Sequence, residues 1–104
     1  MFTKKLLISI MFTLLMSSGA ALAGGDAEAG KALAANCSGC HGENGEGMDP
    51  NPPIAGLEEA KHVQMLKEYK DGTREDPMMQ MFVSQLSDED MANIAAYYAT
   101  LGAD

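Results

Sequence analysis

The sequence predicts an all-α protein. Two segments, residues 57–72 and 87–102, repeat apolar residues at helical spacing, and a third that is rich in alanine follows Asp26. No stretch alternates convincingly between apolar and polar residues as a half-buried strand does, and no internal repeat is visible. Residues 42–56 are rich in glycine and proline, so we expect a long loop there.

The first 23 residues have the pattern of a signal peptide. A short basic start that contains Lys4 and Lys5 precedes an apolar run over residues 6–16, and small residues ending in Ala-Leu-Ala at 21–23 suit a signal peptidase. The apolar run is shorter than the roughly 20 residues that a membrane-spanning helix needs. We therefore expect a cleaved signal peptide over residues 1–23 and a mature chain over 24–104, with an uncleaved anchor as the alternative.

Size and charge restrict the classes of protein that remain. A mature chain of 81 residues would keep five basic and fifteen acidic residues, a formal charge of −10. Nucleic acid is then an unsuitable partner, and the charge favours a soluble monomer that is steered toward basic surfaces. A domain this small usually needs disulfides, a metal or another large group to complete its core. Two cysteines cannot form a disulfide framework, so a cofactor is expected.

The predicted helices begin and end at recognisable signals. Asp26 is suited to cap a first helix that leads to the cysteines. The second helix carries His62, Met65, Leu66 and Tyr69 on one stripe and stops at Gly72. Ser87 and Asp90 resemble a capping box for the last helix. That helix has a stripe of mainly apolar residues: Met91, Ile94, Ala95, Tyr98 and Leu101.

Both cysteines of the chain and one of its two histidines lie together in "NCSGCHG", residues 36–42. A redox disulfide, part of a metal site or a covalently attached haem would each use such residues. If the first helix continues by one turn, Cys37, Cys40 and His41 share a face. Two thiols can then add to the two vinyl groups of a haem while the histidine binds iron, and Cys-x-x-Cys-His is the signature of this attachment.

The redox disulfide and the metal site both lack the sequence features that usually accompany them. A thioredoxin-type disulfide normally lies beside a βαβ pattern, and no strand is predicted. A structural zinc needs further ligands at regular spacing, whereas only His62 and carboxylates remain. Haem is therefore favoured. For His62 itself the simplest interpretation is a packed histidine, with a second iron ligand as the alternative.

Together these segments resemble the class I c-type cytochromes, of the small bacterial monohaem kind and of one half of the dihaem kind. The similar segments are "GDAEAGKALAANCSGCHGENGEG", "PPIAGL", "YKDGTR" and "LSDEDMANIAAYY", in the order that the family has them. The resemblance implies a class I cytochrome c fold for residues 24–104, with three main helices and a long loop wrapped around one covalent haem c.

The resemblance also implies roles for individual residues. Cys37 and Cys40 would form the thioether bonds, and His41 would be the proximal iron ligand. The carbonyl of Pro52 would accept a hydrogen bond from the other ring nitrogen of His41. Gly30 would lie where the first and last helices cross, with an aromatic residue, Tyr97, packed against its backbone.

A methionine is expected as the second iron ligand. Met65 and Met91 lie on helix stripes and suit the core, and Met48 follows His41 too closely to reach the opposite haem face. The cluster of Met78, Met79 and Met81 remains. In the family that it resembles, the ligand precedes the leucine of the "LSD" start by seven residues, which indicates Met79, with Met78 and Met81 as alternatives.

The function that the resemblance implies is single-electron transfer in the periplasm rather than enzymatic catalysis. Its partners would be redox proteins with a basic docking face, with Glu43, Glu46 and Asp49 as candidates for the acidic rim. Two alternatives are a haem c subunit of a periplasmic dehydrogenase, such as a sulfide-oxidising flavocytochrome, and a five-coordinate haem that binds gas or reduces peroxide.

Overall fold

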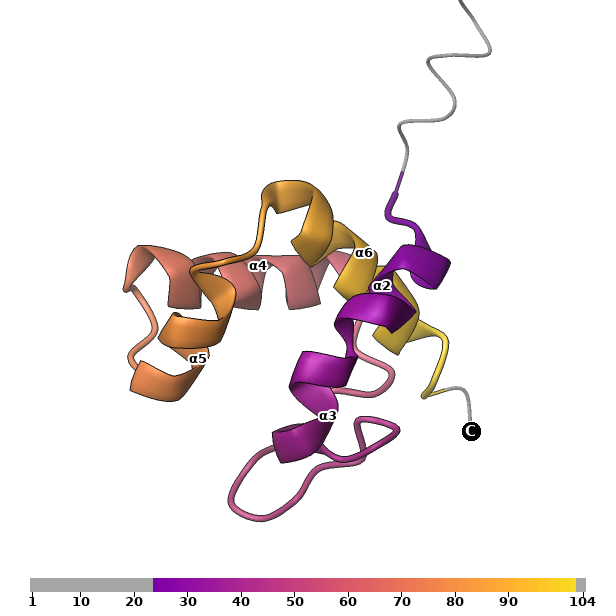
Figure 1. Ribbon diagram of the computed structural model, residues 1–104, viewed down its shortest axis with the longest axis horizontal. Coiled ribbons are helices and arrows are strands. Elements are labelled where there is room, and N and C mark those ends of the chain that lie inside the picture. The colour runs from indigo at the N-terminus through magenta and orange to yellow at the C-terminus, as the bar shows by residue number, and fades with distance from the viewer. Residues whose placement is uncertain (1–23, 103–104) are drawn as a thin grey trace, which may run out of the picture.

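The structure is a computed structural model that describes residues 24–102. The predicted signal peptide lies outside these residues. In the described part of the chain every regular element is a helix, and only an isolated β-bridge between Met48 and Asn51 interrupts the loops. The helices are α2 (Ala27–Leu33), α3 (Ala35–His41), α4 (Glu59–Asp71), α5 (Pro77–Val83) and α6 (Asp88–Ala99) (Figure 1). The all-α class is confirmed.

Helices α2 and α3 follow each other almost without a break, and α3 carries both cysteines. The carboxylate of Asp26 caps α2 by accepting the backbone N–H groups of Glu28 and Ala29. A tight turn at Ala34 separates the two helices, since the N–H of Ala34 donates to the carbonyls of both Gly30 and Lys31. Helix α3 then ends at His41. The first helix was expected to continue by one turn through the cysteine motif, and α3 provides this turn.

Helix α4 follows the expected boundaries. Glu58 caps its start, and Gly72 ends it in the left-handed conformation, with φ 88°, which glycine adopts without steric cost. His62 and Leu66 are buried on the predicted stripe, while Tyr69 is partly exposed.

Helix α5 adds to the three helices expected from the sequence. Asp76 caps it by accepting the N–H groups of Met78 and Met79, and Pro77 occupies the first helical turn. Proline suits that position because its fixed φ is helical and its missing N–H would have no partner there. An Asp-Pro pair also suits a turn, but residues 76–77 start a helix.

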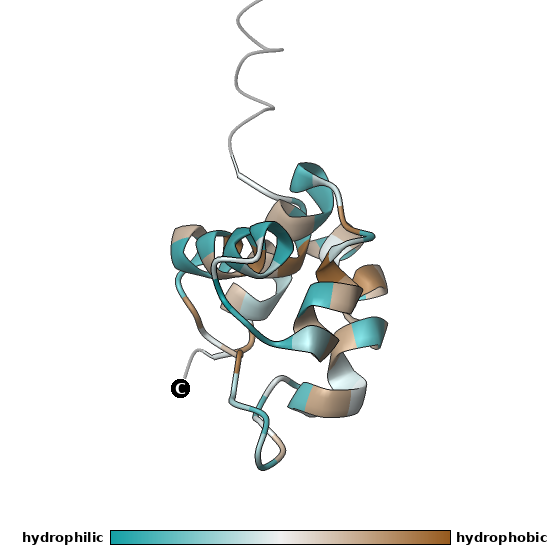
Figure 2. Ribbon diagram, turned by 90° about the vertical axis from the view of Figure 1, so that its left-hand side faces the viewer, coloured by the Kyte–Doolittle hydropathy of each residue, from teal (hydrophilic) through white to brown (hydrophobic). Residues whose placement is uncertain are grey.

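Helix α6 supplies most of the core. The capping box between Ser87 and Asp90 is present, with both reciprocal hydrogen bonds at 3.0 Å. Met91 and Tyr98 have no exposed surface, and Ile94 is only 2% exposed. Residues Ala34, Ile54, Leu66 and Val83 complete this core. Figure 2 shows hydrophilic and hydrophobic residues interleaved along the helices, as amphipathic helices require.

Helices α2 and α6 cross in close backbone contact. A Cβ atom at Gly30 would lie 1.9 Å from the carbonyl oxygen of Asn93, so only glycine fits at this point. The amide side chain of Asn93 also accepts the N–H of Asp26 at 2.8 Å. The predicted crossing at Gly30 is therefore present, and its nearest neighbours are backbone atoms of α6. Tyr97 packs, partly buried, against the core.

The glycine- and proline-rich segment between α3 and α4 is a loop, as predicted. Its folded shape depends on the carbonyl of Gly45, which accepts the N–H groups of both Ile54 and Ala55 at 2.8 and 2.9 Å. Gly45 has φ 72°, and a Cβ there would lie 2.8 Å from the Tyr98 ring. The loop is therefore held by its own backbone hydrogen bonds and packs against α6. None of the helices in residues 24–102 has the length and apolarity that a bilayer crossing requires.

Candidate functional site

His41 ends helix α3 and is held at two points by the loop that follows. Its Nδ1 lies 2.7 Å from the carbonyl oxygen of Pro52, and its own carbonyl accepts the N–H of Gly47 at 2.6 Å. A carbonyl only accepts hydrogen bonds, so Nδ1 carries the proton and Nε2 keeps its lone pair. The contact that the resemblance implied is thus present. It leaves Nε2 as the nitrogen able to bind a metal.

Both thiols precede this histidine on the same short helix. Cys37 and Cys40 are free, and both are partly buried. Among residues 24–102, no group of three or more histidine, cysteine or acidic side chains converges to hold a metal ion, so the motif does not have the geometry of a zinc site. In a haem attachment only the histidine binds iron, and the thiols bond to carbon atoms at the ring edge. The arrangement fits that requirement.

Cys37 lies in an apolar environment beside Tyr98. Burial raises the pKa of the Cys37 thiol; a hydrogen bond with Tyr98 lowers it, and the charge of Cys40 raises it again. Tyr98 is fully buried, and its hydroxyl has no hydrogen-bond partner other than this thiol. A buried thiol of raised pKa is a poor free nucleophile at neutral pH. This environment suits a structural sulfur better than a reactive one.

The methionine cluster of α5 separates into one inward and two outward side chains. Met78 and Met81 are 56% and 53% exposed. Met79 is partly buried, packs against the core and lies close to His41. Its N–H is accepted by Asp76 at 3.2 Å, so the cap of α5 fixes the backbone that carries it. Met91 is part of the core, as its stripe predicted, and Met48 is 50% exposed in the loop.

His62 is the second buried histidine, and it is not part of the motif. It is 3% exposed, its ring centroid is 5.9 Å from that of Tyr98, and its Nδ1 has no hydrogen-bond partner. Burial, with a smaller contribution from the charge of His41, lowers the pKa of His62 to about 4. The side chain is therefore neutral at pH 7. The interpretation of His62 as a packed histidine agrees with this environment.

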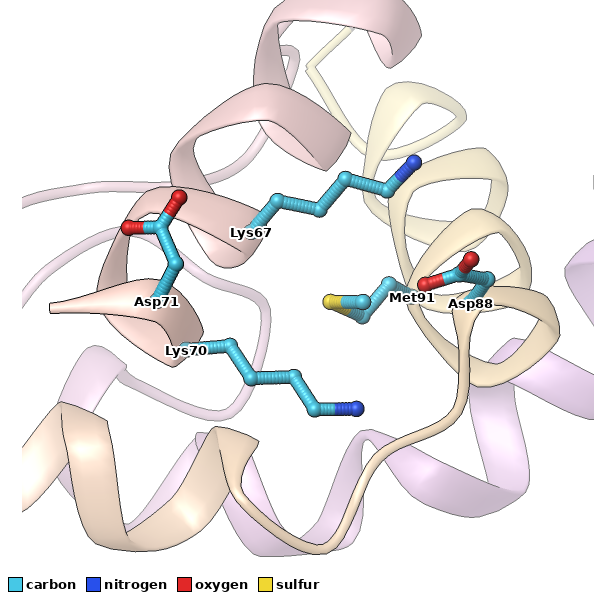
Figure 3. A pocket seen from close by; sticks show the side chains of 5 residues that line it. All are labelled: Lys67, Lys70, Asp71, Asp88 and Met91. Carbon is cyan, nitrogen blue, oxygen red and sulfur yellow. The ribbon is translucent and has the colours of Figure 1, made fainter. Parts of the chain in front are cut away.

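A hollow elsewhere on the surface has none of these features. It measures about 300 Å³, lies between α4 and the start of α6, and is open to solvent. Figure 3 shows the lysines of α4 on one side and the residues of α6 on the other. Its lining residues are Lys67, Lys70, Asp71, Asp88 and Met91. These residues include no thiol and no imidazole.

The residues around the motif fit a covalently bound haem. Two free thiols are spaced by one helical turn, the adjacent imidazole has a free Nε2, and a partly buried thioether lies close to it. Two buried polar atoms in the same region lie in apolar surroundings: Nδ1 of His62 has no hydrogen-bond partner, and the Tyr98 hydroxyl has none other than the Cys37 thiol. Such an apolar shell excludes water from a redox centre and influences its potential.

The comparisons with known proteins agree with this geometry. The model of the cytochrome c family matches residues 27–102. Cytochrome c4 of Pseudomonas aeruginosa is 44% identical over 97 residues, which cover 92% of this chain and 48% of that protein. Cytochrome c-554(548) of Halomonas halodenitrificans is 39% identical over 80 residues, which cover 73% of this chain and 96% of that protein.

Solved structures give the same result. Cytochrome c4 of Acidithiobacillus ferrooxidans superposes with a TM-score of 0.68 at 31% identity, over 72% of this chain and 49% of that one. The chain belongs to the cytochrome c family and has the class I fold, and its cofactor is haem c. It spans about half the length of the cytochrome c4 relatives that it matches.

Two members of the site were not identified from the sequence as site residues. Tyr98 appeared only as part of the core stripe of α6, although its hydroxyl lies beside Cys37. Gly47 appeared only as a loop residue, although its N–H fixes the carbonyl of His41. No local signal distinguishes either residue, because both contacts depend on how distant segments fold together.

Proposed function

We propose that this chain is a periplasmic single-electron carrier in which Cys37 and Cys40 hold the haem and His41 and Met79 are its axial ligands. The main support is the imidazole of His41, because its Nδ1–H is engaged by Pro52 while Nε2 is free to bind iron. When bound, the haem supplies an iron that alternates between the ferrous and ferric states. All other tasks fall to the residues of the chain.

These residues hold the site in one arrangement for both oxidation states. The hydrogen bond to Pro52 fixes the ring of His41 and increases its basicity. Met79 offers a soft thioether sulfur, which favours the ferrous state and raises the reduction potential. The Asp76 cap and the core behind α5 hold this sulfur in place. Little rearrangement is then needed for each electron.

The same ligand set argues against catalysis at the iron. If His41 and Met79 both bind the iron, they would leave no open position for a substrate. The chain would therefore act on redox proteins and not on small molecules. Its charge of −10 after cleavage of the signal peptide favours partners with a basic docking face.

A haem c subunit or domain of a periplasmic dehydrogenase is the second candidate. The fold matches part of a thiosulfate dehydrogenase chain from Marichromatium purpuratum, with a TM-score of 0.68 and 30% identity over 71% of this chain and 18% of that one. Copurification of this chain with a larger dehydrogenase would favour the second candidate, and isolation as a free monomer would favour the carrier.

A redox titration of the purified protein, followed by its visible spectrum, tests the proposal. We expect one covalent haem per chain, a single reversible one-electron transition, and a ferrous form that binds carbon monoxide slowly. Rapid binding of carbon monoxide would indicate a five-coordinate haem and contradict the proposal. Irreversible reduction would contradict it too.

A further inference from the structure

We propose that the turn of residues 47–52 is the surface through which electrons pass between this chain and its partner, and that this partner presents an apolar centre within a cationic rim. We call residues 47–52 the proline turn. The inference rests on the proposed electron-transfer function and assigns the docking surface to one side of the site.

The proline turn is bonded to the iron-binding histidine at both of its ends. Gly47 at one end donates its N–H to the carbonyl of His41, at 2.6 Å. Pro52 at the other end accepts the Nδ1–H of the same residue, at 2.7 Å. A partner that contacts Pro52 would therefore be one hydrogen bond from the imidazole, whereas the bond of Gly47 reaches the backbone of His41.

Internal hydrogen bonds make the turn a preformed surface. Met48 and Asn51 form a reciprocal pair, with N···O distances of 3.1 and 2.7 Å. Just outside the turn, Ile54 and Ala55 are held by the carbonyl of Gly45. Because these contacts fix the backbone before a partner arrives, docking would cost little conformational entropy.

The turn presents apolar side chains to solvent. Met48 is 50% exposed, and Pro50, Pro52 and the adjacent Pro53 are exposed as well. Methionine adapts its shape to different apolar surfaces. Three exposed carboxylates, those of Glu43, Glu46 and Asp49, lie in or beside the turn in the sequence. An apolar centre with a polar rim is the usual anatomy of a protein interface.

These carboxylates are not balanced by basic residues of the same segment. From residue 32 to residue 60 the sequence contains no lysine or arginine. Two other acids differ: the exposed Asp88 lies across the hollow in Figure 3 from the lysines of α4, and the partly buried Glu68 pairs with Arg74 at 3.1 Å. The acidic rim of the proline turn is therefore the better match for a cationic partner.

Two matched double variants separate this surface from the remaining charge. The first is Glu43→Gln with Asp49→Asn, beside the proline turn; Glu46 is kept because its carboxylate accepts the N–H of Asn44 at 2.8 Å. The control is Asp88→Asn with Glu89→Gln at the start of α6, which lies at the opposite end of the molecule from the loop (Figure 1). Both variants remove the same net charge.

The binding probe is tris(phenanthroline)chromium(III), a paramagnetic, redox-inert trication with an apolar surface, added to the haem-loaded protein. We expect it to broaden the backbone amide signals of residues 45–49 and 51 in the wild type and the control, and to broaden them much less in the turn variant. Broadening centred on the signals of α5 or α6 would overturn the proposal. Equal broadening of the turn signals in the turn variant and the control variant would overturn it too.

The corresponding cobalt(III) complex then measures electron transfer. Ferrous iron gives one electron to cobalt, which yields ferric iron and cobalt(II) with no proton or ligand exchanged. At low ionic strength we expect the turn variant to react about fivefold more slowly and the control variant to change little. Equal slowing of both variants would contradict the docking surface. A chain without haem or reversible reduction would instead contradict the proposed function.

Discussion

The hydrogen bond from Nδ1 of His41 to Pro52 decides much of the chemistry at the level of single residues. It selects one tautomer, orients the ring and leaves Nε2 free, all before a metal is bound. The cysteines lie one and four residues before this histidine, partly buried on the same helix. The backbone therefore presents two thiols and one imidazole on a single short helix.

The covalent attachment can be tested at the thiols. Cys37→Ala with Cys40→Ala should leave a chain that loses haem under denaturing conditions, because no thioether remains, while either single variant should keep weaker attachment. Denaturing gels stained for haem peroxidase activity measure this. Ser38→Ala, between the cysteines, is the control and should stain like the wild type. Undiminished staining of the double variant would show that the haem is held in another way.

His62 should make the fold sensitive to acid. Its pKa is about 4 in the folded protein and about 6.5 when exposed, because burial disfavours the charged ring. The unfolded chain therefore binds more protons between these values. The stability contributed by neutral His62 is complete above pH 6.5, falls as pH drops toward 4, and its total loss is on the order of 3 kcal/mol.

The variant His62→Leu should remove this dependence. Leucine has a similar volume and leaves no polar nitrogen buried without a partner. We expect the free energy of unfolding of the haem-loaded variant to exceed that of the wild type at pH 4.5 and the gap to narrow by pH 7. Denaturant titrations followed by far-ultraviolet circular dichroism give the comparison. Identical pH profiles for the two proteins would contradict this account of His62.

At the scale of helices, the crossing of α2 over α6 depends on the absence of one side chain. Gly30 lies so close to the α6 backbone that a Cβ would overlap the carbonyl of Asn93. The hydrogen bond between Asp26 and Asn93 reinforces the same contact. Because α3 continues from α2, the position of the cysteine motif relative to the core follows from this crossing.

Gly30→Ala should therefore destabilise the protein although alanine is the better helix former. The helix gains about 1 kcal/mol in propensity, whereas forcing the helices apart costs about 1–3 kcal/mol and loosens the core. We expect a net loss visible in thermal unfolding of the haem-loaded protein. Gly39→Ala is the matched control, since nothing lies within 4 Å of a Cβ there. A stabilised Gly30→Ala protein would show that the helices can separate freely.

Local signals predicted most of the helices. Asp26, Gly72 and the Ser87–Asp90 box each mark a boundary that the structure has. Helix α5 was not predicted, because its seven residues are too few for an apolar period to be recognised and "DP" also suits a turn. The contacts of Tyr98 with Cys37 and of Gly47 with His41 depend on packing between distant segments. Periodicity and capping carry no information about such contacts.

At the scale of the whole molecule, the fold brings together segments that are remote in the sequence. Helix α3 carries His41, and α5, which packs on α4 (Figure 1), carries Met79. The core shared by α4 and α6 supports both helices. The proline turn adds an acidic surface next to one of the two ligands. The account therefore predicts an iron whose two ligands come from helices that are remote in the sequence.

The identity of the sulfur ligand is the central claim. The weak far-red absorption of ferric haem with methionine ligation reports it directly. We predict this band in the wild type and in Met78→Ala and Met81→Ala, because those two side chains are more than half exposed. Met79→Ala should lose the band, and its ferrous form should bind carbon monoxide rapidly. A band that survives Met79→Ala and disappears in Met81→Ala would contradict the account.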